Sequence, residues 1–589
     1  MQKLKVFWEV PKQIDEISSN TLYLIFLSPE NEENFHHSFK VSTFNGRDFI
    51  PSIESEAQRI YKQIISQIGL LKGKNKITLR KLLKSNSDTS LWWFHPVAFR
   101  DSEGEPTYSK ILQILTIINI IKDNHIDSLT LYGADKEMEK VLSSEISTEV
   151  KKDLFFNFLE YVFVLKSSLK EVISRIRLFF NLLKTIHACR KLYQLPEKKI
   201  KIAFAGFWNW SFYEDLKISG ELSDRYFASL PNHLKNNFGI STGYFAWLSS
   251  GTSFGRNVMP FEQLLKPLKK RDDVVLLQSF LKPIEVFRVI FNFKPFLLFK
   301  QTWRNTEDKK MLIIDDIDWS HLFSRRLIYG FLGTSIPQCE LMALATERAV
   351  EMFEPKMTMS FLEHYPISRA FYSGVRLASP ITKCWAVQHA SYNKGKTWYF
   401  LDPKFERSGD PDGIKVPSPD GVFVMGRLGQ RLFESCGYPS EAIKLTGSPR
   451  YDYLSKIKNR FIKSNCNSKF EVLLVATLNI EIELDALEAI CIAAKGLDQI
   501  ELKIRSHPSV KLENHPQFWR WSDQVTSSTG SLEEDLDSCS LVIYSYSTVA
   551  EEAILQGLPA WQWMPKGLNG SALSEIENIP RFTSVSALR

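Results

Sequence analysis

Short apolar runs alternate with stretches of helical periodicity from Lys199 to the end of the chain, and this alternation constrains the fold more than any other feature. The first group of candidate strands comprises Ile200–Phe207, Val274–Gln278, Leu312–Asp315, Met357–Phe361 and Cys384–Gln388. The second group comprises Gly421–Met425, Ala442–Thr446, Val472–Ala476, Leu502–Ile504 and Leu541–Tyr544. Strands that alternate with helices form parallel sheets covered by helices on both faces, and ligands bind beyond the carboxyl ends of such strands. The sequence therefore predicts an α/β protein with two Rossmann-like domains that face a cleft.

Local composition divides the chain into five parts. Residues 1–145 are predicted to form an N-terminal α/β region, with strands at Leu22–Leu27 and Ser128–Tyr132, and residues 146–197 form a helical insertion. The first Rossmann-like domain is expected over 198–401 and the second over 421–589. Residues 402–420 between them are dense in Pro, Gly, Ser and Asp, which is typical of a linker, and they are predicted to be the hinge.

The overall composition excludes several classes of protein. Hydrophobic residues make up 44% and charged residues 24% of the 589, as in ordinary soluble globular proteins. The net charge of +7 is modest, and no Arg/Lys block or known module indicates a nucleic-acid partner. The seven cysteines form no CxxC pair and are odd in number, so neither a zinc site nor a disulfide framework is expected. The chain has no signal-peptide core and no apolar run of about 18 residues, which predicts a cytoplasmic protein.

Residues 146–195 combine helical periodicity with many phenylalanine and basic side chains. One interpretation is a helical hairpin that packs on the neighbouring sheet. The other is a basic amphipathic surface that makes peripheral contact with the inner membrane. The sequence leaves both interpretations open.

The stretch Leu541–Ala560 has the pattern of an anion-binding loop. A short run rich in β-branched residues, Leu541–Tyr544, leads into Ser545, Ser547 and Thr548 and then into a helix over Val549–Leu555. The first amides of a helix are unpaired and its dipole is positive at that end, so such a loop can hold a phosphate. The simpler alternative is that Ser547 or Thr548 only caps the helix.

Two further loops follow predicted strands and carry matching chemistry. Gly447, Ser448 and Arg450 come after the strand at Ala442–Thr446; the glycine allows close approach to the backbone, and the arginine offers a fork of donors for phosphate. His507 ends the strand at Leu502–Ile504, and Pro508 holds its backbone extended. A histidine at a strand end is more often structural, so the three loops are informative mainly as a set.

The order and spacing of these motifs resemble the donor-binding half of two-domain (GT-B) glycosyltransferases, above all bacterial sialyl- and Kdo-type transferases. The corresponding residues are His507-Pro508 and Ser545–Thr548, with Glu552 in the helix behind. The segments Ala386–His389 and Leu445–Arg450 are similar to the larger group of surface-carbohydrate biosynthesis proteins. The resemblance implies that a nucleotide-sugar donor is held by the following residues: His389, Gly447, Ser448, Arg450, His507, Pro508, Ser545, Ser547, Thr548 and Glu552.

The same resemblance implies transfer of an ulosonic acid from a CMP donor to a glycan or lipid-linked glycan, in the synthesis of a lipopolysaccharide O-antigen or capsule. It implies no cofactor. Two alternatives stay open: a transferase on the same fold that uses a UDP- or GDP-sugar or a polyol phosphate, and a non-catalytic sugar-binding assembly protein. A shared fold does not separate these alternatives.

Two carboxylates on the first wall of the cleft are candidates for the catalytic base. Glu363 follows the strand at Met357–Phe361, and Asp224 follows the strand at Ile200–Phe207. Each has a structural alternative: Asp224 as the cap of a helix over 225–230, and Glu363 as the partner of Arg369.

The segment Asp316-Ile317-Asp318 has the DxD form that binds a metal in another class of glycosyltransferase. The motif is short and common, and Arg450 with helix amides can take the phosphate charge. The sequence therefore predicts metal-independent catalysis.

Overall fold

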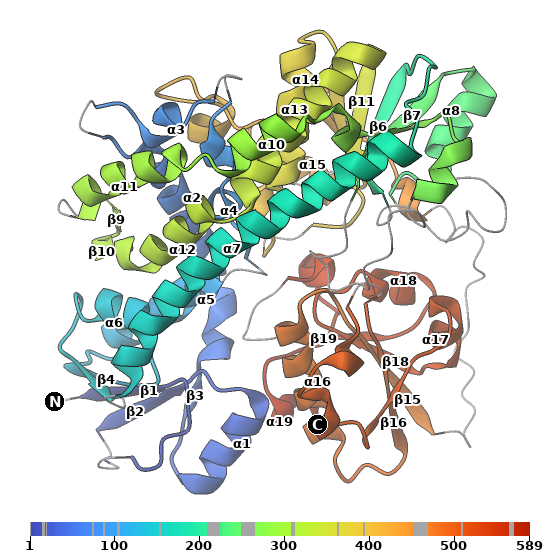
Figure 1. Ribbon diagram of the computed structural model, residues 1–589. Coiled ribbons are helices and arrows are strands. Elements are labelled where there is room, and N and C mark those ends of the chain that lie inside the picture. The colour runs from blue at the N-terminus through green and yellow to red at the C-terminus, as the bar shows by residue number, and fades with distance from the viewer. Residues whose placement is uncertain are drawn as a thin grey trace.

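The computed structural model describes residues 2–14, 18, 20–73, 76–85, 89–102, 106–151, 155–208, 224, 226–248, 265–307, 312–361, 365–392, 395–451, 469–507, 510–564 and 570–589. Three parallel sheets with flanking helices organise the chain (Figure 1). The α/β class predicted from the sequence is confirmed.

The N-terminal sheet has five parallel strands in the order β3-β2-β1-β4-β5. Their bounds are Lys3–Phe7 (β1), Thr21–Ile25 (β2), Phe44–Asn45 (β3), Ser128–Tyr132 (β4) and Thr148–Lys151 (β5). The helices of this region are α1 (Pro29–Ser38), α2 (Ile50–Leu70), α3 (Leu79–Leu82), α4 (Pro96–Phe99), α5 (Pro106–Asp123) and α6 (Lys136–Leu142). The two strands predicted here, at 22–27 and 128–132, are present as β2 and β4.

The middle sheet has seven parallel strands in the order β14-β13-β12-β11-β6-β7-β8. Their bounds are Ile202–Trp208 (β6), Thr242–Leu248 (β7), Val274–Leu276 (β8), Met357–Phe361 (β11), Lys383–Val387 (β12), Gly421–Val424 (β13) and Ile443–Leu445 (β14). Its helices include α8 (Leu230–Phe238), α10 (Pro283–Ile290), α11 (Lys294–Glu307), α12 (Ser320–Leu332), α13 (Ser335–Phe353), α14 (Pro366–Ala378) and α15 (Arg427–Ser435).

Two strands that were predicted to begin the second domain belong to this middle sheet instead. β13 pairs with β12 through Trp385 and Gly421, and β14 pairs with β13 through Val422 and Ile443. The change from one sheet to the other therefore falls between β14 and β15. Residues 402–420 therefore link two strands of the same sheet. The prediction of a hinge failed because a Pro- and Gly-rich composition marks turns and not specifically domain boundaries.

The segment 402–420 is also fixed to the N-terminal region by two buried ion pairs. Arg100 Nη1 lies 2.8 Å from Glu406 Oε2, and Arg80 Nη2 lies 2.6 Å from Asp412 Oδ1. Arg80 in addition donates to the carbonyl oxygens of Phe405 and Asp410. These contacts fix the segment 402–420 against the N-terminal region.

The strand predicted at Leu312–Asp315 is not part of a parallel sheet. Ile313–Ile314 (β9) and Ile317–Asp318 (β10) pair as a short antiparallel ribbon. Asp315 and Asp316 at its tip have positive φ angles of 52° and 66°, and this tight reversal prevents a continuous strand. Asp318 Oδ1 accepts a hydrogen bond from Ser320 N at 3.0 Å, so the last residue of the DxD motif caps the start of α12.

The C-terminal domain, residues 469–589, has six parallel strands in the order β17-β16-β15-β18-β19-β20. Their bounds are Phe470–Val475 (β15), Ile500–Arg505 (β16), Val525–Ser527 (β17), Leu541–Tyr544 (β18), Ala560–Trp563 (β19) and Arg581–Phe582 (β20). The helices are α16 (Ile480–Ala494), α17 (Leu532–Ser538), α18 (Val549–Leu555) and α19 (Val585–Leu588). The three strands predicted within this range are confirmed as β15, β16 and β18.

The hydrophobic cores separate the molecule into two bodies. One cluster runs from Leu4 in β1 through Phe331 in α12 to Val422 in β13, so the N-terminal and middle regions share a core. The C-terminal sheet has its own clusters, one that includes Leu474 and Ile543 and another that includes Leu473 and Val542. Alternate residues of β15 and β18 thus bury against opposite layers, as in a sheet covered on both faces.

Residues 155–192 form a single helix, α7 (Phe155–Leu192), of 38 residues. This helix lies within the stretch predicted to be helical, whereas the hairpin interpretation is wrong because the helix is continuous. Figure 1 shows α7 running diagonally along the molecule beside α10 and α12. The buried guanidinium of Arg175 fixes it there by donating to carbonyl oxygens at the ends of α10 and α12, those of Ile290, Phe331 and Leu332 among them. Within the part of the chain that the structure describes, no helix is long and apolar enough to cross a membrane.

The C-terminal domain also touches the N-terminal region, through α16 and α1 (Figure 1). Arg47 Nη2 lies 3.2 Å from Asp485 Oδ1, and Trp563 Nε1 donates to Asp485 Oδ2 at 2.7 Å. Nearby, Arg520 Nη2 lies 2.5 Å from Glu30 Oε2. We call the contact made by these five residues the rear contact.

Candidate functional site

Loops that follow β12, β14 and β18 meet between the two bodies and form a polar cluster. The guanidinium of Arg450 lies between them: Nη1 donates to the His389 carbonyl oxygen at 3.4 Å, and Nη2 donates to Thr548 Oγ1 at 3.5 Å. The structure therefore brings together three of the residues predicted from the sequence.

A second bridge, between Ser391 and Glu551, lies in the same cluster. Ser391 Oγ donates to Glu551 Oε2 at 2.8 Å, and Lys396 Nζ donates to the Ser391 carbonyl oxygen at 3.4 Å. Burial raises the pKa of Glu551, and the hydrogen bond from Ser391 and the charges of Lys396 and Arg450 partly oppose that rise. We call Arg450, His389, Thr548, Ser391 and Glu551 the cleft cluster.

The buried ring of His389 is held among aromatic side chains. It makes edge contacts with the rings of Tyr226, at a centroid distance of 4.7 Å, and Phe361, at 5.6 Å. The rings of Tyr226 and Phe361 stack on each other at 4.4 Å. The middle sheet therefore fixes one wall of the cluster by packing.

Gln388 fixes the backbone next to His389. Its Oε1 accepts from Met425 N at 2.9 Å and its Nε2 donates to the Ala390 carbonyl oxygen at 3.0 Å. Gly429 is required beside it, because a Cβ at that position would lie 2.6 Å from Gln388 Oε1. The amide of Gln388 thereby ties β13 to the loop that carries His389.

Several hydroxyl groups of the predicted site are buried at the cluster. Among the residues that the structure describes, the Oγ atoms of Ser448 and Ser545 have no hydrogen-bond partner. Ser547 Oγ accepts a long bond of 3.4 Å from Val549 N, which is the capping role that the sequence left open. Gly447 is exposed, and a Cβ there would meet nothing within 4 Å, so the backbone at this point is accessible.

The N-terminus of α18 differs from the anion site that the sequence suggests. The helix spans only seven residues, and Glu551 and buried Glu552 occupy its first turn. Acidic side chains at that position already complement the positive end of the helix dipole. Positive charge in the cleft cluster therefore comes mainly from Arg450.

His507 lies at the same edge of the C-terminal sheet but farther along it. It follows β16, which β15 separates from β18, so it is roughly 10 Å from Ser545 at two strand spacings. The preceding Ser506 is fixed by hydrogen bonds to Glu513 and Leu512. Pro508 lies outside the described residues.

Of the two carboxylates considered as a base, Glu363 lies outside the described residues. Asp224 is only 2% exposed, and its Oδ1 accepts from the amides of Tyr226 at 2.6 Å and Phe227 at 3.0 Å. Burial raises its pKa to about 6, although those two hydrogen bonds oppose the rise. Its Oδ2 is buried, and no partner for it is found in the described part of the chain.

The sequence did not indicate Ser391, Lys396 or Glu551 as site residues. Glu551 carries one available signal, because it lies one turn after the hydroxyl residues, but an acidic residue there is also explained by the helix dipole. Ser391 and Lys396 lie in a loop without periodicity and gave no signal.

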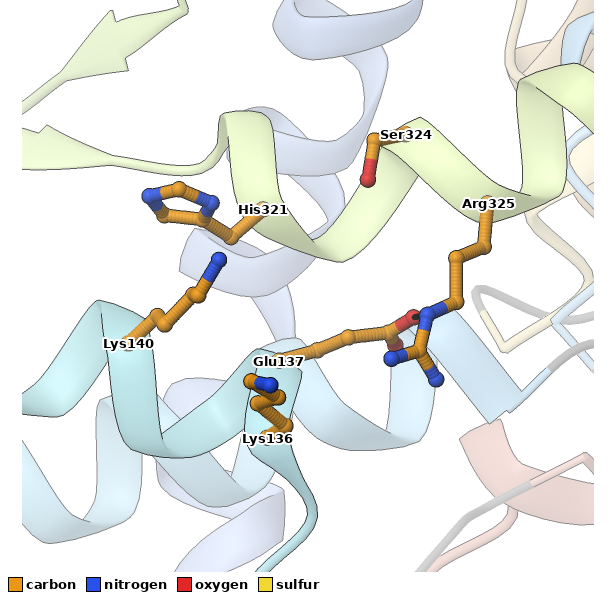
Figure 2. A pocket seen from close by; sticks show the side chains of 6 residues that line it. All are labelled: Lys136, Glu137, Lys140, His321, Ser324 and Arg325. Carbon is orange, nitrogen blue, oxygen red and sulfur yellow. Dashed lines mark ion pairs between the residues drawn. The ribbon is translucent and has the colours of Figure 1, made fainter. Parts of the chain in front are cut away.

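A separate cationic pocket lies between α6 and α12 (Figure 2). Its volume is about 160 Å³, and it is lined by Lys136, Glu137, Lys140, His321, Ser324 and Arg325. Glu137 pairs there with Arg325 at 3.7 Å and with Lys110 at 2.6 Å. None of its lining residues belongs to the cleft cluster. Within the described ranges no group of three or more His, Cys, Asp or Glu side chains could hold a metal ion.

No family model and no curated protein matches the chain. Solved structures with some similarity include a Methanocaldococcus jannaschii UDP-GlcNAc 2-epimerase in complex with UDP-GlcNAc and UDP. That structure is 12% identical, with 66% of this chain and 90% of the other covered at a TM-score of 0.37. A Neisseria meningitidis UDP-GlcNAc 2-epimerase bound to UDP-GlcNAc is 11% identical, with 61% and 81% covered at 0.33.

A glycosyltransferase of kitacinnamycin is 11% identical, with 67% of this chain and 89% of the other covered at a TM-score of 0.32. TM-scores below 0.5 at these identities support no inference about activity. The two bodies with parallel sheets and the polar cluster between them are the basis for assigning a function.

Proposed function

We propose that this chain is a GT-B-type glycosyltransferase that binds a nucleotide-sugar donor at the cleft cluster. The observation that carries the proposal is the position of Arg450 between loops of the two bodies. Two of its bonds, at 3.4 and 3.5 Å, are long and go to neutral oxygen atoms. A donor phosphate would bind the guanidinium more strongly than either of them.

Neutral donors around Arg450 suit the same ligand. Ser448 and Ser545 offer buried hydroxyls, and the backbone at Gly447 is open to close approach. Buried polar groups usually have partners, so these hydroxyls favour a polar ligand in the cleft. We include His389, His507, Pro508, Ser547, Thr548 and Glu552 in the donor site because of their motifs.

In the proposed reaction an acceptor hydroxyl oxygen attacks the anomeric carbon of the sugar. The bond from that carbon to the phosphate oxygen breaks, its electron pair stays on the phosphate, and the hydroxyl proton passes to a protein base. Arg450 and the fixed hydroxyl and amide dipoles stabilise the charge that develops on the phosphate. This arrangement requires no metal, so we expect activity to survive EDTA.

We propose a CMP-activated ulosonic acid as the donor and a glycan or lipid-linked glycan of a bacterial surface polysaccharide as the acceptor. The motif resemblance at His507-Pro508 and Ser545–Thr548 supports this choice. A UDP- or GDP-sugar would place a second phosphate at the same guanidinium, and only a binding comparison separates the two donor classes.

Nucleotide binding to Arg450 variants tests the proposal. A panel of CMP, CDP, UDP and GDP is measured by thermal shift and calorimetry, since a ligand at 100 times its Kd stabilises by ~2.7 kcal/mol. Arg450→Ala should weaken binding of the preferred nucleotide by roughly 10- to 100-fold, as expected for loss of a hydrogen bond to a charged group worth about 1.5–3 kcal/mol. His507→Ala should weaken it less. Arg431→Ala, at an exposed position on α15, is the matched control. Nucleotide affinity unchanged by Arg450→Ala would contradict the proposal.

For the base we propose Glu363 ahead of Asp224. A pKa of about 6 suits Asp224 to proton abstraction near neutral pH, but its burial and its two backbone hydrogen bonds suit a structural role in the turn that precedes α8, which begins at Leu230. Glu363→Gln should lower kcat by about 10²–10⁴-fold with little change in nucleotide affinity, whereas Asp224→Asn should mainly lower stability. Turnover within a few-fold of the parent in both variants would show that neither residue is the base.

A further inference from the structure

The solvent-facing side of α7 carries a continuous apolar row. Leu169, Ile173, Ile176 and Phe180 are 59%, 39%, 41% and 55% exposed. Their spacing of four, three and four residues places all of them on one face of the helix. On the adjacent helix α10, Ile284 and Phe287 are 55% and 50% exposed, and the Phe287 ring contacts Phe179 of α7 at 6.0 Å. We call these six exposed residues the docking face.

The docking face is not needed for the core of the protein. The opposite side of α7 is already buried, through Arg175, Leu182 and Ile186. Single exposed apolar residues are common on protein surfaces, but an aligned row over three turns that continues onto a second helix marks an interaction site.

A row of basic residues runs beside the apolar row. Lys166, Lys170, Arg177 and Lys184 are exposed and, at 100° per residue, lie about 50–90° around the helix from it. Between Lys166 and Leu192 the sequence has one acidic residue, Glu171, which is half-buried. Arg288 of α10 is exposed next to Phe287.

We propose that the docking face binds the surface of a bilayer that contains anionic lipid. The apolar row would enter the boundary between headgroups and acyl chains, and the basic row would lie on the negative headgroups, as in interfacial amphipathic helices. A second copy of this chain is disfavoured as the occupant, because it would place its own basic row against this one. Docking in this way does not depend on any residue of the cleft cluster.

Vesicle sedimentation of the full chain, without nucleotide, tests this proposal. Vesicles of phosphatidylcholine alone are compared with vesicles that also contain phosphatidylglycerol, each at low and high salt. Binding is expected only to the anionic vesicles, and it should weaken with salt because exposed charges are screened.

Two paired variants separate the charge from the apolar contribution. Lys170→Glu with Arg177→Glu should lower the partition coefficient at least 25-fold, at roughly fivefold for each lost positive charge. Leu169→Ala with Phe180→Ala should lower it roughly tenfold or more. Lys235→Glu and Phe238→Ala, both exposed on α8, are the matched controls and should bind like the parent. All these side chains are exposed, so thermal midpoints should stay unchanged.

The proposal would be overturned by equal binding to both kinds of vesicle. It would also be overturned if the docking-face variants bound the anionic vesicles as well as the parent does. So would a parent that ignores vesicles but forms dimers that Phe180→Ala dissociates, because the face would then join two copies. Failure of nucleotide binding at the cleft cluster would not affect any of these readouts.

Discussion

Among the described residues, two contacts of the C-terminal domain with the rest of the molecule, the rear contact and the cleft cluster, differ in chemistry. In the rear contact a buried ion pair joins Arg47 and Asp485, whose side chains are 4% and 8% exposed, and Trp563 completes the carboxylate's hydrogen bonds. In the cleft cluster two bonds of Arg450 go to neutral oxygens at 3.4 and 3.5 Å, and its charge acts on the buried carboxyl group of Glu551. At the rear a cation and a carboxylate are paired at close range, whereas in the cleft two of the bonds of Arg450 are long, and under the proposed function a donor phosphate replaces them. We therefore expect changes at the rear contact to affect stability and changes at the cleft cluster to affect ligand binding.

The largest effect on stability is expected at the rear contact. Arg47→Ala leaves the buried carboxylate of Asp485 without its cation, and removal of one partner of a buried pair typically costs about 3–5 kcal/mol. Urea unfolding measures the loss. Arg520→Ala is the control in the same contact, because its partly exposed pair with Glu30 should be worth under about 1 kcal/mol. Equal losses in the two variants would mean that the buried pair does not fix the domain.

An effect of intermediate size, a dependence of stability on pH, is expected from Glu488, which interacts with Glu30 and Asp485 of the rear contact. Burial, the hydrogen bond and charge of Glu30, and the charge of Asp485 raise the pKa of Glu488 to about 7. Between the unfolded value near 4.5 and this folded value, the native state binds more protons than the unfolded state, so stability should fall as pH rises through that window. This change in pKa corresponds to roughly 3 kcal/mol, and screening by solvent should reduce the loss of stability above pH 7 to on the order of 2 kcal/mol.

Glu488→Gln should remove this pH dependence and make the protein more stable than the parent above pH 7. Denaturant midpoints at pH 5, 6, 7 and 8 measure it. A parent that becomes more stable from pH 5 to pH 8 through Glu488 would reverse the expected sign and show that the carboxyl group is paired with a cation.

The sequence predicted the strands of the C-terminal domain better than their partition between domains. β15 and β18 are mostly apolar runs of six and four residues, and β16 alternates apolar with charged residues; local composition reveals both patterns. The membership of β13 in the middle sheet depends on its pairing with β12, 36 residues earlier at Trp385 and Gly421, and no local pattern encodes such a pairing. Likewise the DxD motif could be recognised as a turn only from the positive φ angles of Asp315 and Asp316.

The sequence predicted those site residues whose presence has no ready structural explanation. Arg450 after a glycine and a serine had a specific chemical meaning, and the structure places it in the cleft cluster. Glu551 was missed because an acidic residue in the first turn of a helix has a sufficient structural explanation. Ser391 becomes visible only through its hydrogen bond to Glu551, 160 residues away.

The smallest effect is expected at the bridge between Ser391 and Glu551. A double-mutant cycle with Ser391→Ala and Glu551→Gln should give a coupling energy of about 0.5–1.5 kcal/mol, the usual net value of one hydrogen bond. Burial already raises the pKa of Glu551, so its charge is unfavourable where it lies, and the neutral Gln should cost little by itself. Urea unfolding gives the cycle, and calorimetry with the preferred nucleotide shows whether the bridge opens when ligand binds. If it opens, Ser391→Ala should tighten nucleotide binding by up to the same coupling energy. A coupling of 3 kcal/mol or more would make this bridge as strong as the pair of Arg47 and Asp485, and the two contacts of the C-terminal domain would then no longer differ in kind.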